Sequence, residues 1–77
     1  MKAYTFPIEI APDEARWFAR VPSLETQGAA TWGYTREEAL RNIEEVAQMV
    51  IEAMLEDGTP LPSDITVSDH PVVSINV

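Results

Sequence analysis

Alternating hydrophobic and polar residues at the start of the chain predict a β-strand with one buried face. Every second residue is hydrophobic over four positions: Tyr4, Phe6, Ile8 and Ile10. A period of two places these side chains on the same face of a strand. Pro7 interrupts the strand because it has no N–H to donate to a neighbour. We therefore expect one strand over residues 3–10, with a bulge or an unpaired position at Pro7.

Two further short strands are expected before a helix. Residues 11–15 contain proline and acidic residues in a pattern typical of a turn. Residues 16–21 follow closely enough to complete a hairpin with the first strand. After a polar loop over residues 23–28, the short apolar segment 29–32 predicts a third strand.

A long helix follows, and both of its ends carry sequence signals. Thr35 stands at the expected N-cap and Glu38 follows three residues later, which together form a capping box. Gly58 supplies the left-handed residue that commonly ends a helix. The helix is therefore predicted to begin after Thr35 and to end near Asp57.

The chain beyond this helix predicts an extended connector and a last strand. Residues 59–62 contain two prolines, and residues 63–70 form a loop that allows a short extended piece at 65–67. Residues 72–77 alternate as expected for a final strand. The order β-β-β-α-β indicates one domain of the α+β class over residues 1–77.

The helix has more hydrophobic surface than one sheet needs. Its apolar residues are Ala39, Leu40, Ile43, Val46, Ala47, Val50, Ile51, Ala53, Met54 and Leu55. They cover roughly half of the circumference, whereas packing on one sheet takes an arc of about 100°. Either the excess forms an interface, or the loop over residues 63–71 covers it. We favour an interface because so small a domain buries little surface by itself.

The charge balance narrows the class of partner. Thirteen acidic residues against five basic ones give a formal net charge of −8. Such a field repels phosphate backbones and anionic lipids and attracts basic proteins. An acidic surface also keeps small proteins soluble without any specific partner. The charge therefore favours a basic protein partner or solubility alone, and it disfavours nucleic acid.

No catalytic site is expected on this chain. It has no cysteine and one histidine, His70, whose neighbour Asp69 would point to the opposite side of an extended segment. Except for Glu9, the acidic residues lie on the helix and in turns, and the glycines match no phosphate-binding pattern. Trp17 and Trp32 are more typical of a core than of base stacking. We predict no enzyme activity, no metal and no cofactor.

Neither a membrane span nor a secretion signal is expected. No apolar run approaches the roughly 20 residues that a spanning helix needs. Lys2 is followed by an alternating stretch rather than by the apolar core of a signal peptide. These features predict a cytoplasmic protein.

The residues around the start of the helix form a recognisable motif. Thr31, Gly33, Thr35, Glu38 and Ala39 make the pattern T-x-G-x-T-x-x-E-A. With this pattern the chain resembles the N-terminal domain of HicB-family antitoxins along essentially its whole length. Further matches to the family lie at the end of the second strand and after the helix: Pro22, Leu24, Gly58 and Pro62.

The resemblance implies a partial ribonuclease-H-like fold without the nuclease carboxylates. One mostly antiparallel four-stranded sheet, in the order 3-2-1-4, would have its last strand parallel to the first and one long helix on one face. The resemblance also implies homo-oligomers and a small basic HicA-like RNA-cleaving toxin as partner. The loop after Leu24 is about two residues longer than usual and lacks the common proline-glycine-cysteine run. No helix-turn-helix or ribbon-helix-helix segment is present in the sequence, so DNA binding is not carried over.

Two functions follow from the residues and the resemblance together. The first is an antitoxin-like module of a toxin-antitoxin system, which neutralises a basic HicA-like toxin by masking its active surface. The alternative is a stand-alone oligomeric HicB-like domain with a structural or small-ligand role and no toxin partner. The candidate partner-binding residues are acids on the polar arc of the helix: Glu37, Glu45, Glu52 and Glu56.

Overall fold

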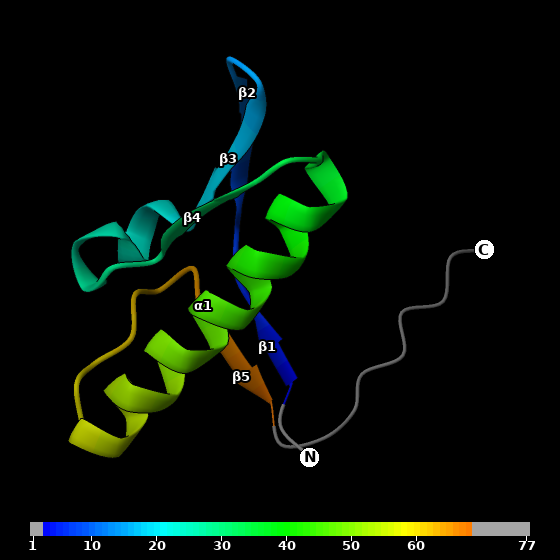
Figure 1. The fold of residues 1–77 in the computed structure, drawn as a ribbon. Coiled ribbons are helices and arrows are strands. Elements are labelled where there is room, and N and C mark those ends of the chain that lie inside the picture. Colours follow the sequence, from blue (N-terminus) through cyan, green and yellow to red (C-terminus); the bar gives the residue numbers. More distant parts are fainter. Residues whose placement is uncertain (1–2, 69–77) are drawn as a thin grey trace.

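The computed structural model describes residues 3–68, which form five strands, a 3-10 helix and one long α-helix (Figure 1). In chain order the elements are β1 (Ala3–Thr5), β2 (Glu9–Asp13), β3 (Arg16–Arg20), η1 (Pro22–Gln27), β4 (Ala30–Gly33), α1 (Arg36–Asp57) and β5 (Thr66–Ser68). The expected α+β composition with one long helix is present. The short extended piece expected at residues 65–67 is also present, as β5.

The strands form two sheets rather than the single four-stranded sheet that we expected. β2, β3 and β4 make a three-stranded antiparallel sheet in that order, and β1 pairs only with β5. The 3-2-1-4 order is therefore wrong for this chain. The strand that returns beside β1 is antiparallel to it, with Tyr4 opposite Val67. The strand predicted over residues 72–77 lies outside the described residues.

Pro7 explains why the expected first strand is divided. The segment Phe6-Pro7-Ile8 has no strand structure and separates β1 from β2, so that each half pairs with a different neighbour. A proline contributes no N–H to a ladder, and the disruption here is larger than one bulge. The hairpin between β2 and β3 is confirmed, but its turn is shorter than predicted. It comprises Glu14 and Ala15, and β2 includes Pro12 at its edge.

Both predicted ends of α1 are confirmed. The Thr35 hydroxyl oxygen accepts a hydrogen bond from the Glu38 N–H at 3.0 Å. The Glu38 carboxylate accepts one from the Tyr34 N–H at 3.1 Å, one residue earlier than a standard capping box places it. Gly58 ends the helix with a left-handed backbone at φ 74°.

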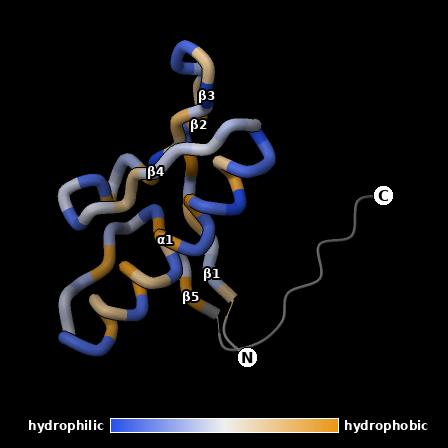
Figure 2. Tube along the Cα trace, viewed as in Figure 1, coloured by the Kyte–Doolittle hydropathy of each residue, from blue (hydrophilic) through white to orange (hydrophobic). Residues whose placement is uncertain are grey.

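The core lies between α1 and the strands and contains no buried polar side chain among the described residues. Its buried members are Ala19, Val21, Leu24, Ala29, Ala39, Ile43, Ala47, Ile51, Met54 and Ile65. In Figure 2, hydrophobic and hydrophilic residues alternate along the turns of α1, as one buried face requires.

Close approach between β4 and α1 depends on small residues. A Cβ atom on Gly33 would lie 2.5 Å from the backbone nitrogen of Ala39, well inside van der Waals contact. The Asn42 side-chain amide donates a 2.9 Å hydrogen bond to the Trp32 carbonyl oxygen and ties the helix to the same strand. Gly33 therefore sets the distance between β4 and the first turns of α1.

The segment after α1 covers part of the surplus hydrophobic surface of the helix. Ile65 is buried in the core, and Leu61 and Val67 pack against it. Met49 nevertheless remains 68% exposed and Leu55 39% exposed. The loop therefore covers part of the surplus and Leu55 stays partly exposed, whereas we had expected either an interface or complete cover by the loop.

Candidate binding surfaces

All four candidate glutamates lie exposed on α1, but only three of them share a face. Glu45, Glu52 and Glu56 are separated by seven and four residues, which places them within about 40° around the helix. They span about 16 Å along its axis. Glu37 lies eight residues before Glu45 and about 80° further round, so it does not belong to this face.

The three carboxylates differ in how they are held. Glu52 accepts hydrogen bonds from the Tyr4 hydroxyl at 3.3 Å and from the Gln48 side-chain amide at 3.2 Å. These contacts fix its position. Glu45 and Glu56 form no ion pair or side-chain hydrogen bond with the residues that the structure describes. Their charges therefore face solvent and are available to a partner.

A methionine on this face was missed by the sequence analysis. Met49 lines a shallow depression together with Glu45, Gln48 and Glu52, and its side chain is 68% exposed. Met49 falls outside the apolar arc that the periodic pattern predicts to face inward. Its spacing of four from Glu45 and three from Glu52 was the available signal. We refer to Glu45, Gln48, Met49, Glu52 and Glu56 as the acidic helix face.

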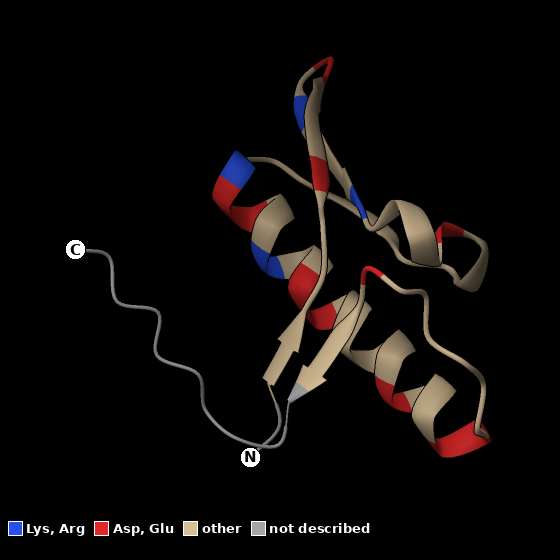
Figure 3. Cartoon of the chain, turned by 180° about the vertical axis from the view of Figure 1, so that it is seen from behind, with Lys and Arg blue, Asp and Glu red and all other residues tan. Residues whose placement is uncertain are grey.

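Charge is strongly segregated between the two ends of the molecule. Residues 42–68 contain six acidic residues and no basic one, while all four arginines lie in residues 3–41. Figure 3 shows blue segments at the hairpin and on the first turns of α1, and only red ones further along the helix. Arg41 lies four residues from both Glu37 and Glu45, a spacing that allows ion pairs on a helix, but neither pair forms within residues 3–68, where both ion pairs belong to Arg20. The acidic helix face thus has no internal neutralisation.

A second surface lies on the side of the three-stranded sheet that α1 leaves uncovered. Phe18 stands directly opposite Trp32 across β3 and β4, with 40% and 42% of their surfaces exposed. The Tyr34 ring is 68% exposed and meets the Trp32 ring edge-on, with centroids 5.1 Å apart. We call Phe18, Trp32 and Tyr34 the aromatic sheet face. Trp17 packs against the core as expected, whereas Trp32 does not.

Charged groups around the aromatic sheet face are paired. The Arg16 guanidinium lies 5.0 Å from the centre of the Trp32 ring. Arg20 forms ion pairs with Glu9 at 2.6 Å and Glu25 at 2.7 Å. Hydrogen bonding to Glu9, together with the negative charges of Glu25 and Glu9, raises the pKa of Arg20 above its ordinary value. This face is therefore locally balanced in charge, unlike the acidic helix face.

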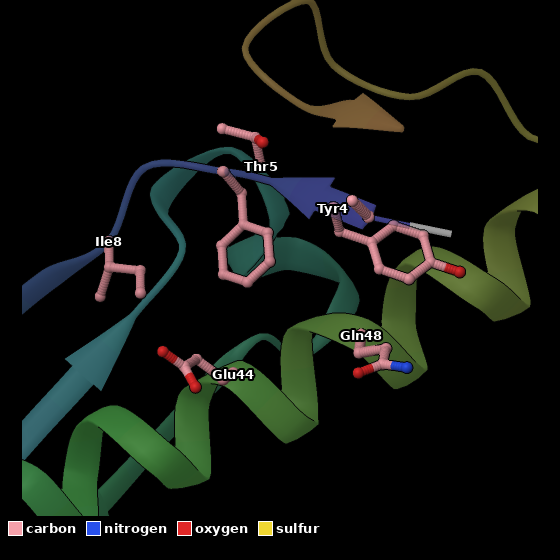
Figure 4. A pocket seen from close by; sticks show the side chains of 7 residues that line it. Tyr4, Thr5, Ile8, Glu44 and Gln48 are labelled. Carbon is pink, nitrogen blue, oxygen red and sulfur yellow. The ribbon is translucent and has the colours of Figure 1, made fainter. Parts of the chain in front are cut away.

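A hollow of about 490 Å³ lies between β1, the segment after it and α1 (Figure 4). Its lining residues are Ala3, Tyr4, Thr5, Phe6, Ile8, Glu44 and Gln48. The volume is in the range of small-ligand pockets. Its lining contains one carboxylate, that of Glu44, and no second carboxylate or histidine to form an acid–base pair with it.

Within residues 3–68, no group of three or more histidine, aspartate or glutamate side chains is arranged to hold a metal ion. None of the described helices is long and apolar enough to cross a membrane. His70, the histidine considered above, lies outside the described residues. Neither protein-family models, nor curated proteins, nor solved structures give a match to this chain.

Proposed function

We propose that this chain is a HicB-like antitoxin module that captures a small basic RNA-cleaving protein on its acidic helix face. The observation that carries the proposal is the segregation of charge. Residues 42–68 contain no basic residue. Within them, the carboxylates of Glu45 and Glu56 lie on one exposed face of α1 and form no ion pair with the described residues.

The composition of the acidic helix face supports capture of a cationic protein surface. Unpaired carboxylates steer a positively charged partner and raise its association rate above that of neutral pairs. Met49 lines the same depression as Glu45 and Glu52 and offers an exposed, adaptable apolar contact beside their carboxylates. The complementary partner surface carries an apolar group flanked by lysine or arginine. An RNA-binding surface has such basic residues because it must contact phosphates.

Masking explains how the chain can act without catalytic residues of its own. A protein that covers the RNA-binding surface of a ribonuclease blocks substrate access by excluded volume and by neutralising charge. That role requires complementarity of shape and charge alone. The T-x-G-x-T-x-x-E-A pattern is the feature that the chain shares with HicB-family antitoxins, and within it Gly33 and Thr35 shape the β4–α1 junction.

The proposal is tested by measuring binding to the basic product of an adjacent reading frame as a function of salt. We expect association faster than the roughly 10⁵–10⁶ M⁻¹s⁻¹ of uncharged pairs, and a steep decline as ionic strength rises. Growth should be rescued when the chain is co-expressed with the toxic product. A basic product that neither binds the chain nor is neutralised by it would refute the antitoxin function.

Charge reversal on the helix locates the surface. The double variant Glu45→Lys, Glu56→Lys removes two unpaired acids and leaves the Tyr4–Glu52 hydrogen bond in place. The control Asp13→Lys, Glu14→Lys changes the net charge equally at the hairpin tip. We expect the helix variant to slow association by about tenfold or more and the control to have a smaller effect. Equal slowing by both variants would show that net charge, rather than this face, directs binding.

The alternative function, a stand-alone oligomer, is favoured by a different observation. The aromatic sheet face exposes three large rings that the single chain does not cover. If no basic neighbour binds, self-association through such a surface becomes the better account of the chain. The two functions need separate surfaces and can be tested separately.

A further inference from the structure

The uncovered side of the three-stranded sheet differs from an ordinary solvated sheet face. Strand alternation places Phe18 and Trp32 on the side opposite the buried Ala19. Tyr34 extends the same row beyond the end of β4 through its edge-on contact with Trp32. A sheet with one solvated face normally presents polar residues there, so three neighbouring aromatic rings indicate a contact surface.

We propose that the aromatic sheet face binds a second copy of this chain, sheet against sheet, about a twofold axis. This proposal does not depend on the antitoxin function, because it concerns a different surface and the chain alone.

Charge decides in favour of a second copy over the basic partner. Glu9 and Glu25 offset the charge of Arg20, which borders the aromatic rings together with Arg16, so this face offers a cationic protein little of the attraction that the acidic helix face provides. Two copies, in contrast, can approach here because Glu9 and Glu25 neutralise Arg20, and Asp13 stands opposite Arg16 in the register. At the acidic helix face two copies would repel each other. The near-neutral surface and the acidic surface therefore suit different occupants.

The area is consistent with a small dimer. The exposed parts of the three rings amount to roughly 300–400 Å², given the size of aromatic side chains. A standard interface takes about 800 Å² from each partner. The remainder of the uncovered face, including Ala11 opposite Phe18 and the aliphatic stems of the arginines, can supply the rest. Stacked sheets pack about 10 Å apart, which lets the rings of the two copies interdigitate.

The oligomeric state of matched variants tests the proposal. Trp32→Ser combined with Tyr34→Ser removes two rings but leaves the backbone hydrogen bonds of both residues, to Asn42 and Glu38, available. Met49→Ser is the control, because Met49 has the same 68% exposure as Tyr34 and lies on the acidic helix face. Sedimentation over a wide concentration range should give twice the 8.6 kDa chain mass for wild type and Met49→Ser, and the chain mass for the double variant.

Hydroxyl-radical footprinting of the wild type tests the same surface without any substitution that could unfold the chain. Raising the protein concentration should protect Trp32 and Tyr34 at least severalfold and leave Met49 reactive. A wild type that stays at the chain mass at all concentrations would overturn the proposal. So would protection confined to Met49, or a dimer that Met49→Ser abolishes and the double variant keeps.

Discussion

Replacing Gly33 with alanine would introduce a methyl group where β4 meets the first turn of α1. The new Cβ atom would lie 2.5 Å from the Ala39 nitrogen and 2.9 Å from the Glu38 carbonyl carbon. Ordinary contact requires the strand and the helix to separate by roughly 1 Å. Both atoms belong to the helix backbone, so a side-chain rotation cannot relieve the overlap.

The energetic effect is large for a domain of this size. Overpacking of this kind costs about 1–3 kcal/mol, against a total stability of about 4–12 kcal/mol for a chain of this length. Displacing the helix start also strains the Thr35 cap, whose hydroxyl accepts the Glu38 N–H at 3.0 Å. We expect the melting temperature to fall by about 4–8 °C for each kcal/mol lost.

Urea unfolding followed by circular dichroism measures the loss, and asparagine substitutions at two glycines separate its causes. Gly58 has a left-handed backbone at φ 74° and open space around it, so asparagine, which tolerates that conformation, should retain most of the stability. Gly33→Asn should be at least as destabilising as Gly33→Ala, since any Cβ meets the helix. A Gly33→Ala protein within about 0.5 kcal/mol of wild type would refute the close approach of β4 and α1.

Two further predictions concern single side chains. Thr35→Ala should destabilise the fold by about 0.5–2 kcal/mol while Thr35→Ser retains the cap, and an unchanged melting curve for the alanine variant would place the helix start elsewhere. The Ser23 hydroxyl oxygen is buried and has no hydrogen-bond partner among the described residues. Ser23→Ala should therefore be neutral or stabilising, and a loss above about 1 kcal/mol in urea unfolding would reveal a hydrogen bond to that hydroxyl.

The sequence predicted some residues of the candidate sites and missed others. Helical spacing alone placed Glu45, Glu52 and Glu56 on one exposed face, because all three lie on a regular helix whose buried arc is plain in the sequence. The same reasoning grouped Glu37 with them, although it lies on another face. It passed over Met49, an apolar residue outside the inward-facing arc that the structure leaves 68% exposed. The resemblance to HicB-family antitoxins stays a prediction.

The sequence by itself determined those helix ends and turns that depend on interactions between residues close together in the chain. Thr35, Glu38 and Gly58 define α1 to the residue, because capping and left-handed termination depend on neighbouring backbone groups. The β2–β3 hairpin follows for the same reason. Strand partners depend instead on segments far apart in the chain. Only the tertiary structure decided that the chain divides at Pro7, with β1 beside β5 and β2 beside β3. It also decided which tryptophan is exposed: alternation gives two faces to β3 and β4, and the position of α1 buries only one of them.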